Sequence, residues 1–323
     1  MMNRRDCLIL TSAAIAGGFI RTAAAETYPA NTINIIVPFP PAGSADLIGR
    51  LVQQGLAAGL GGTVIVTNHP GGGGNNGAAL ASKAKPDGYT LLVTTGALSQ
   101  SPYLFKDVAY NPIKSFDGIS LIAETYTCLA VRADSPFKSL QDIIDAAKPK
   151  PGELIYASAM SSSQHVAGEL FSQAAGIKLT HAAYQGGLPN VQAVVKGEAT
   201  MAFVSLPNVT PLVANGTMRI IAVAERRRIK ALPDVPAISE TFPDVFVPPA
   251  WVSAFAPKGT PRPIIDRLSR VIQTALDTPE KQHLIEVAGF TPVLSNAAEL
   301  DERLKSDVDI WGRVIPKAGI KQQ

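Results

Sequence analysis

The sequence predicts an α/β protein built as two units, with the second unit inserted into the first. Short apolar runs alternate with amphipathic stretches along most of the 323 residues, which is typical of parallel sheets with crossover helices. A long apolar run at Ser120–Pro136 contains no turn signal and could carry the chain from one sheet to another. The strand–helix rhythm then restarts, and a proline-rich bridge at Leu232–Ala250 leads to further strand and helix patterns.

The elements of the first unit follow from their patterns. Strands are expected where aliphatic and β-branched residues form short runs between turn formers, at Thr32–Phe39, 62–68, Tyr89–Thr95 and 251–257. Helices are expected where apolar residues recur at helical spacing, at Ala45–Leu60, 75–85, 261–277 and in two further stretches that reach Trp311. The segment 101–119 is rich in turn formers, so we expect it to be irregular.

The second unit repeats the same alternation. Strands are expected at 153–158, 179–184, 199–205 and 218–224, and helices at 140–148, 163–176, 188–198 and 209–216. We therefore assign 26–122 and 245–323 to one lobe and 123–244 to the other.

Composition and charge exclude several classes of protein. Hydrophobic residues make up 46% of the chain and charged residues 17%, which suits a folded globular protein. The net charge is +3, and the basic run Arg226–Arg228 is too short to indicate a nucleic-acid partner. The four histidines lack metal-ligand spacing, and the sequence contains neither GxSxG nor GxxxxGK[ST]. We expect no metal site and no Walker-type phosphate loop.

The first 25 residues have the features of an export signal. Arg4 and Arg5 precede an apolar run from Cys7 to Ile20, and Ala23–Ala25 offers a cleavage site. The paired arginines favour the twin-arginine route. Cleavage near Ala25 would remove Cys7 and leave Cys128 without a partner, so no internal disulfide is expected.

The stretch VPFPPAGSADLIGR, Val37–Arg50, places two prolines and a turn of small residues directly before a helix. The first N–H groups of a helix have no internal partner, and the helix dipole leaves this end partly positive. A bare turn lets an anion approach these groups, so the stretch is a candidate seat for a carboxylate or phosphate. A plain strand-to-helix connection with Ser44 or Asp46 as N-cap is the alternative.

A glycine-rich segment, Asn68–Leu80, carries Gly72, Gly74 and Gly77 in the spacing of a dinucleotide-binding loop. The next strand ends without the Asp or Glu that would hold a ribose hydroxyl, which counts against a nucleotide. Consecutive glycines also describe a loop that exposes backbone N–H groups to any anion.

Two loops of the second unit follow the same logic. Tyr156–His165 places serine hydroxyls after a strand, and Ala183–Asn190 places a diglycine turn before a helix. Ligands of open α/β sheets bind at the carboxyl ends of strands, so both loops are candidates for a binding site.

Six ordered blocks of the sequence resemble the Bug-type receptors of tripartite tricarboxylate transporters. The blocks are INIIVPFPPAGSADLIGRLV, NHPGGGGNNGA, KPDGYTLL, AYQGGLPNVQAVVKGE, ALPDVPAISE and WVSAFAPKGTPRPIIDRL, and the resemblance runs from Ile33 to Gly319. It implies a two-lobed periplasmic binding protein of type 2 topology, a Venus flytrap that is not an enzyme and closes on a small carboxylate. It also implies inner-membrane permease subunits as partners and no cofactor.

By this resemblance, one ligand carboxylate lies on the loop Phe39–Asp46, largely through backbone amides and ordered water. The residues expected at the ligand are Phe39, Pro40, Ala42, Gly43, Ser44, Asp46, Asn75, Ser158, Ser161, Ser162, Ser163, His165, Tyr184, Gly186, Gly187 and Val204.

Three features depart from the family pattern. Glycine is common where Ala42 and Ser44 stand, and the segment before His165 is usually glycine-bearing, whereas here it is SAMSSSQH. Many members carry an acidic residue, which can hold a ligand ammonium, where this chain has Val204. An ammonium in a closed site would lack its counter-charge, so we expect a ligand without an amino group.

The sequence therefore predicts an exported, monomeric receptor that captures a dicarboxylate, tricarboxylate or aromatic acid in the periplasm. Two alternatives stay open: a periplasmic enzyme with a nucleotide cofactor, and a sensor subunit that signals to a membrane kinase.

Overall fold

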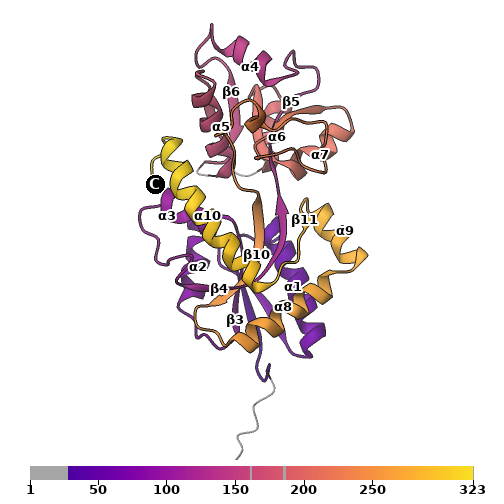
Figure 1. The fold of residues 1–323 in the computed structure, drawn as a ribbon. Coiled ribbons are helices and arrows are strands. Elements are labelled where there is room, and N and C mark those ends of the chain that lie inside the picture. Colours follow the sequence, from indigo (N-terminus) through magenta and orange to yellow (C-terminus); the bar gives the residue numbers. More distant parts are fainter. Residues whose placement is uncertain (1–27, 161, 185–186, 323) are drawn as a thin grey trace, which may run out of the picture.

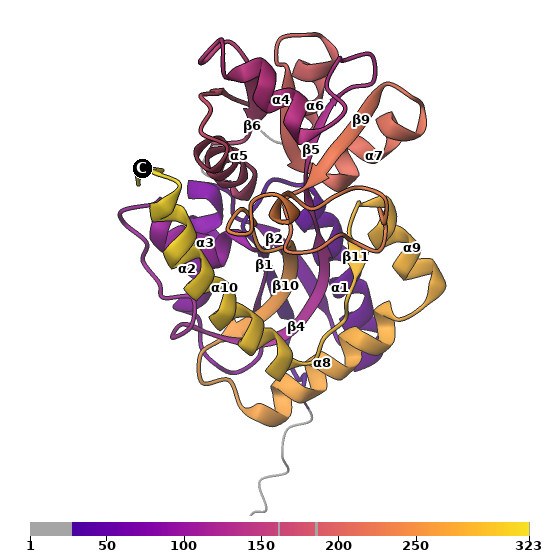
Figure 2. The ribbon, with the colours of Figure 1, turned by 45° about the horizontal axis from the view of Figure 1, so that its top comes forward.

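The computed structural model describes residues 28–160, 162–184 and 187–322, which form two α/β lobes, one above the other in Figure 1. In each lobe helices cover both faces of a mixed sheet, as Figure 2 shows from a second side. The two-lobed α/β architecture is the one that the sequence predicts. The export signal predicted for 1–25 lies outside the described residues, as do Ser161 and Gly186.

Lobe 1 contains a six-stranded sheet in the order β11-β4-β10-β3-β1-β2. Strands β1, β2 and β3 are parallel, while β10 runs antiparallel to both β3 and β4. The strands are β1 (Ile33–Val37), β2 (Val64–Asn68), β3 (Thr90–Thr95), β4 (Phe116–Thr125), β10 (Ala250–Pro257) and β11 (Thr291–Pro292).

Two hydrophobic clusters cover the faces of this sheet. Ile33, Ile35 and Val37 of β1 join residues of α1, α8 and α9, whereas Ile36 points to the opposite face. Successive strand side chains point to opposite faces, so a run of aliphatic residues serves both clusters. The helices of lobe 1 are α1 (Ser44–Leu60), α2 (Asn75–Ser82), α3 (Ala97–Leu104), α8 (Arg262–Leu276), α9 (Pro279–Val287) and α10 (Ala297–Lys317).

Lobe 2 contains a five-stranded sheet in the order β7-β6-β8-β5-β9. Phe203 of β8 packs with the cluster under α4 and α5, and Val204 packs with the cluster under α6 and α7. The elements are β5 (Thr127–Arg132), α4 (Leu140–Ala147), β6 (Ile155–Ser158), α5 (Ser163–Ala174), β7 (Thr180–Ala183), α6 (Gly187–Val195), β8 (Met201–Ser205), α7 (Leu206–Ala214) and β9 (Met218–Val223).

Two parts of the chain differ from the sequence prediction. The segment 101–119, expected to be irregular, contains the second half of α3 and the start of β4, and β11 is an additional short strand. Helix α3 includes Pro102, but Leu98 and Leu104 are 2% and 1% exposed, so burial of its apolar side chains outweighs the helix-breaking effect of proline.

Three segments connect the lobes. The long apolar run predicted to cross between sheets does so at Tyr126, between β4 and β5. The chain returns before β10, and α10, drawn in yellow in Figure 1, extends from the lower lobe to the upper one. Leu300 and Leu304 at the start of α10 join a lobe 1 cluster, whereas Trp311 and Ile315 join the main cluster of lobe 2. The sequence patterns did not predict this third connection.

Arg303 of α10 forms hydrogen bonds with residues of all three connecting segments. Its guanidinium donates to the Glu124 carboxylate before the first crossing (3.3 Å) and to the Pro249 carbonyl before β10 (2.9 Å). It also donates to Asp307 one turn along α10 (2.9 Å), and Asp307 accepts from the indole N–H of Trp251 (2.7 Å). We call Glu124, Arg303 and Asp307 the junction cluster.

Across the three described ranges, no helix has both the length and the apolar character needed to cross a membrane.

Candidate ligand-binding surface between the lobes

The topology makes the candidate loops of the two lobes face each other. Strand β5 begins at Thr127, immediately after the first crossing, and pairs antiparallel with β8 so that Thr127 lies opposite Ser205. The carboxyl ends of β8 and its parallel neighbours β6 and β7 therefore lie on the side of lobe 1. In lobe 1, β10 places Ala250 opposite Thr125, so the carboxyl ends of β3 and parallel β1 lie on the side of lobe 2.

Asp46 holds the loop after β1 in shape. Its carboxylate accepts hydrogen bonds from the Ala42 N–H (3.0 Å), the Arg50 guanidinium (2.9 Å) and the Asn68 amide (2.9 Å). The same Asn68 amide donates to the Phe39 carbonyl (3.0 Å). Asp46 is only 2% exposed, so it stabilises the loop through these buried hydrogen bonds. The sequence had placed it at the ligand. Sequence reasoning missed Arg50 and Asn68, whose role depends on this contact.

The hydrogen bonds around Asp46 stabilise the negative charge of its carboxylate. Burial by itself would raise the pKa of this carboxyl group. The hydrogen bonds from Arg50, Asn68 and Ala42 outweigh that effect and lower the pKa below its usual value, so Asp46 is ionised at neutral pH. Its charge is already matched by Arg50.

The start of α1 keeps backbone donors available. Gly43 is the N-cap and provides no side-chain cap, and the first helical hydrogen bond runs from the Leu47 N–H to the Gly43 carbonyl. In the described part of the chain, no group accepts from the N–H of Gly43 or Ala45. Pro40, Ala42 and Gly43 are exposed, and Ala42 has φ 65°. These free N–H groups at a helix start could hold an anion.

The glycine-rich loop packs against aromatic rings. Gly71, Gly72, Gly73 and Gly74 all have positive φ, which side chains other than glycine rarely adopt. A Cβ on Gly74 would lie 3.1 Å from the Phe39 ring, and one on Gly73 would lie 3.0 Å from another phenylalanine ring. The glycines are thus explained by conformation and packing, without a nucleotide. Asn75, which begins α2, accepts from the Tyr110 hydroxyl (2.8 Å).

Serines of lobe 2 take structural roles at the end of β6. Ser158 is 0% exposed, and its hydroxyl lies 2.8 Å from Nε2 of His181. Ser162 is the N-cap of α5 and accepts from the His165 N–H (3.2 Å). Ser163 is 4% exposed, with its hydroxyl 3.3 Å from the Gln164 amide oxygen. Of these three, Ser162 is the least buried.

Two histidines stack behind these serines. The rings of His165 and His181 lie 4.0 Å apart at 15°, and His165 is 8% exposed. Burial, and then the charge of His181, lower the pKa of His165 to about 4, and burial also lowers the pKa of His181. Both imidazoles are therefore neutral at neutral pH and supply no cation to a ligand.

The starts of α6 and α7 lie together. Gly187 begins α6, and a Cβ on it would lie 2.1 Å from the side-chain amide of Asn208 in α7. The Gln164 amide donates to the Ser205 hydroxyl (2.9 Å), which links the starts of α5 and α7. The Tyr184 N–H donates to the Ser158 carbonyl (3.1 Å). Sequence reasoning missed Gln164, Ser205 and Asn208, because only the fold brings these three helix starts together.

Val204 lies in the core, contrary to the expectation that it contacts the ligand. It is 0% exposed and packs with Cys128 and Val209 under α6 and α7. The alternation of β8 turns its side chain into this cluster, away from the surface that faces lobe 1. Val204 therefore does not decide whether the ligand carries an ammonium group.

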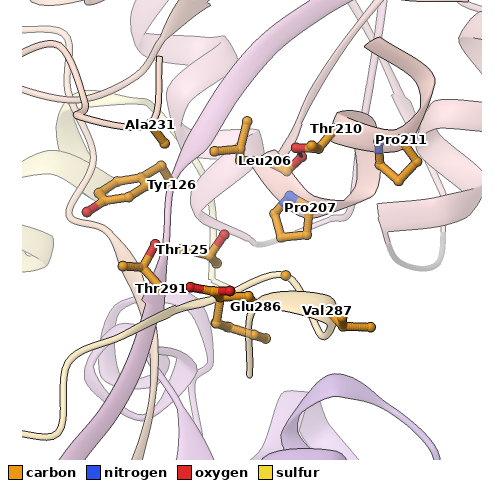
Figure 3. A pocket seen from close by; sticks show the side chains of 12 residues that line it. Thr125, Tyr126, Leu206, Pro207, Thr210, Pro211, Ala231, Glu286, Val287 and Thr291 are labelled. Atoms are coloured by element: carbon orange, nitrogen blue, oxygen red, sulfur yellow. Dashed lines mark hydrogen bonds between the residues drawn. The ribbon is translucent and has the colours of Figure 1, made fainter. Parts of the chain in front are cut away.

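A separate hollow of about 450 Å³ lies between the lobes, beside the first crossing (Figure 3). Tyr126 lines it together with Leu206 and Pro207 of α7 and Glu286 and Val287 of α9. None of the predicted site residues lines this hollow, and the Glu286 carboxylate in its wall disfavours an anion.

Among the described residues, no group of three or more His, Cys, Asp or Glu side chains could hold a metal ion.

Two covered sheets whose loops face each other across a junction of three segments define a periplasmic-binding-protein fold. The chain matches the model of the tripartite tricarboxylate transporter family receptor (TctC) over residues 48–320 and belongs to that family of solute-binding receptors. It is therefore a receptor and not an enzyme, which removes the nucleotide-enzyme alternative.

Solved structures of similar proteins agree with this assignment. The periplasmic binding protein BugD is 28% identical, with a TM-score of 0.76 over 92% of this chain and 100% of that one. Rpa4515 of R. palustris, solved with adipate, is 26% identical, with a TM-score of 0.78 over 92% and 100%. MatC of Rhodopseudomonas palustris, solved with malate, is 28% identical, with a TM-score of 0.73 over 89% and 100%.

Proposed function

We propose that this receptor captures a small organic carboxylate in the periplasm and delivers it to membrane permease subunits. One observation carries the proposal: the N–H groups of Gly43 and Ala45 at the start of α1 have no acceptor in the described part of the chain. They lie on the side of lobe 1 that faces lobe 2. The adipate and malate bound by two homologues support the same class of ligand here.

The proposed ligand contacts divide the predicted residues into two groups. Asp46, Ser158, Ser163 and His165 are buried and act by holding the loops. We assign the direct contacts with the ligand to the remaining predicted residues except Val204, from both lobes. These are Phe39, Pro40, Ala42, Gly43, Ser44, Asn75, Ser161, Ser162, Tyr184, Gly186 and Gly187.

Thermal unfolding with a panel of carboxylates and their neutral amides tests the ligand class. A ligand that binds only the folded state at 100 times its Kd stabilises it by about 2.7 kcal/mol, which raises Tm by several degrees. Adipate, succinate, citrate and benzoate should include at least one stabiliser, and the matched adipamide, succinamide and benzamide should have no effect. Equal stabilisation by an acid and its amide would contradict an anion seat.

The predicted twin-arginine signal and the periplasmic homologue support export to the periplasm. Delivery to a permease, as opposed to signalling to a kinase, is tested by uptake of the radiolabelled stabilising carboxylate. Cells that lack the receptor gene should lose uptake and regain it when the gene is restored. Unchanged uptake would favour a sensor. Size-exclusion chromatography with light scattering should give the mass of a monomer.

A further inference from the structure

A short basic stretch after β9 has no part in the proposed ligand contacts. All its charged members are exposed and line a hollow of about 980 Å³; they are Arg226, Arg227, Arg228 and Lys230. The guanidinium of Arg228 is paired, since it donates to both carboxylate oxygens of Glu240 (2.8 and 2.9 Å). Arg226 lies over the ring of Phe246, with Cζ 3.9 Å from the ring centroid. Within the described ranges, Arg227 and Lys230 have no ion pair and no side-chain hydrogen bond.

The carboxyl groups in the wall of this hollow compensate little of that positive charge. Glu124 is engaged elsewhere, because it accepts from the guanidinium of Arg303 (3.3 Å) and from the Tyr126 hydroxyl (3.0 Å). Glu225 is buried, and burial followed by the charge of Glu124 raises its pKa to about 9, so it is neutral at neutral pH. In the described part of the wall, Glu286 is the one carboxylate left ionised without a lysine or arginine partner. The hollow therefore has a net positive charge.

This basic hollow is continuous with the apolar hollow of Figure 3. The two share four wall residues, which are Tyr126, Ala231, Glu286 and Thr291. Figure 3 shows Pro207 and Pro211 of α7 on one side of the apolar hollow and Val287 of α9 on the other. Val287 is 71% exposed, more than any other large apolar side chain in the described ranges. We call the two hollows together the junction groove.

Both lobes form the junction groove. The basic stretch and α7 belong to lobe 2, whereas Glu286, Val287 and Thr291 belong to lobe 1. No residue of the loop 38–45 lines either hollow, so the groove is separate from the proposed carboxylate seat. Exposed apolar side chains beside unpaired cations on a folded protein mark a surface for a partner.

We propose that the junction groove is the surface by which this receptor docks on a membrane protein, through a segment that carries aspartate or glutamate beside apolar side chains. The acidic side chains pair with Arg227 and Lys230, and the apolar side chains pack on Val287 and Pro207. A flat lipid surface cannot enter a groove between two lobes, so the geometry favours a protein segment over anionic lipid. This inference rests on the proposed delivery to membrane permease subunits and identifies the surface that makes the delivery contact.

A double charge reversal, Arg227→Glu with Lys230→Glu, tests the basic end of the groove. Lys178→Glu with Lys196→Glu is the matched control, because both are exposed residues of lobe 2 and the net charge changes equally. Lys178 precedes β7 and Lys196 follows α6, so both lie at the ends of these elements that point away from lobe 1. Val287→Ser tests the apolar end, and Leu80→Ser is its control. Leu80 is also exposed (48%), but α2 covers the other face of the lobe 1 sheet.

Right-side-out membrane vesicles from the native cells expose the periplasmic face of the membrane and serve as the probe. Fluorescently labelled receptor should sediment with them, and the double charge reversal should weaken this binding about tenfold. Val287→Ser should weaken it several-fold, and both controls should bind like wild type. Salt at about 0.5 M should weaken binding of wild type, because it screens exposed charges. Vesicles treated with protease, and vesicles of pure phosphatidylglycerol, should not bind the receptor.

Two results of this measurement would overturn the inference. Binding of the double charge reversal that equals its control would show that the groove is not the docking surface. Binding that survives protease treatment, or that phosphatidylglycerol vesicles reproduce, would assign the basic stretch to lipid in place of a protein.

Uptake separates a failure of the inference from a failure of the proposed function. In cells that lack the receptor gene, the double charge reversal should restore uptake of the stabilising carboxylate about tenfold less well than wild type. Its Tm shift with that carboxylate should be unchanged. Full uptake with the double charge reversal would overturn the inference and leave the receptor function standing. If no carboxylate stabilises the protein and the wild-type gene restores no uptake, the proposed function fails and the inference fails with it.

Discussion

Gly289 of lobe 1 lies so close to Pro207 of lobe 2 that a Cβ atom on Gly289 would fall 1.7 Å from the Cβ of Pro207. Gly289 follows α9 and Pro207 stands in the first turn of α7, so this contact joins the two lobes directly. It borders the hollow shown in Figure 3. The two lobes can approach this closely only because residue 289 has no side chain.

Gly289→Ala should destabilise the protein more than strain alone would. Gly289 has φ 87° and Gly197 has φ 77°, but nothing lies within 4 Å of a Cβ on Gly197. Gly197→Ala should therefore cost about 1–2 kcal/mol of left-handed strain. Gly289→Ala should cost about 1–3 kcal/mol more, because the lobes must separate. Urea unfolding of both variants measures the difference. Equal losses of unfolding free energy would show that the residues around Pro207 can shift to accept the added Cβ at little cost.

Ligand binding should bring the lobes together. Two lobes joined by a few connecting segments can close on a ligand by rotation about those segments. Small-angle X-ray scattering should give a smaller radius of gyration with a saturating carboxylate than without it. An unchanged radius, with binding confirmed by calorimetry on the same sample, would exclude closure.

Gly43→Pro and Ser44→Ala separate backbone from side-chain recognition. Gly43 has φ −75°, which proline also adopts, so Gly43→Pro mainly removes the N–H and should weaken carboxylate binding about tenfold or more. Ser44→Ala keeps the N–H and should weaken binding only a few-fold. Ala45→Pro, in the first turn where proline is tolerated, is a second variant that removes an N–H. Equal effects of Ser44→Ala and both proline variants, in proteins with unchanged circular dichroism, would argue against a backbone seat.

Asp46→Asn should lower the free energy of unfolding at neutral pH by about 1–3 kcal/mol, because it weakens three hydrogen bonds to a buried charge. The folded-state pKa of Asp46 is depressed, so this stability is present above the unfolded pKa and is lost as pH falls through the folded value. The difference from wild type should therefore shrink below about pH 4. Asp266→Asn, which breaks an exposed pair with Arg262, is the control and should change little.

Glu225→Gln should stabilise the protein at alkaline pH. Glu225 is 6% exposed, its Oε1 has no partner among the described residues, and burial and the neighbouring Glu124 raise its pKa to about 9. Above about pH 4.3 the unfolded chain releases this proton and the folded chain keeps it, so stability falls as pH rises towards 9. Glutamine mimics the protonated form and removes this loss. The Tm of Glu225→Gln should exceed that of wild type at pH 8 and approach it at pH 4.5; the reverse order would mean that the charged form is preferred.

The sequence predicted most strands and helices, because each is encoded by a local alternation of apolar and polar residues. Helix α3 was missed because its only strong support is tertiary: Leu98 and Leu104 are buried although Pro102 disfavours a helix. The crossing at Tyr126 was predicted from the unbroken apolar run around it.

The candidate site was predicted less completely. The role of each side chain depends on the face of the strand or helix from which it points and on the residues that the fold brings into contact with it. The seat at the start of α1 follows from local sequence, whereas the support of that loop by Asn68 comes from the next strand. Val204 was placed at the ligand from the resemblance to the family alone, whereas its position along β8 turns its side chain into the core. The junction cluster joins Glu124 to Arg303, which are far apart in the chain, so no local pattern could indicate it.

The place of β10 between β3 and β4 affects how the nascent chain folds on the ribosome. Strands β3 and β4 do not pair with each other, so the sheet of lobe 1 stays open until Ala250–Pro257 has been synthesised. Lobe 2 is continuous between the two crossings and can close its sheet first. During that interval the apolar edges of β3 and β4 are exposed to other chains, and a chaperone that binds extended apolar segments would act on this half-finished lobe.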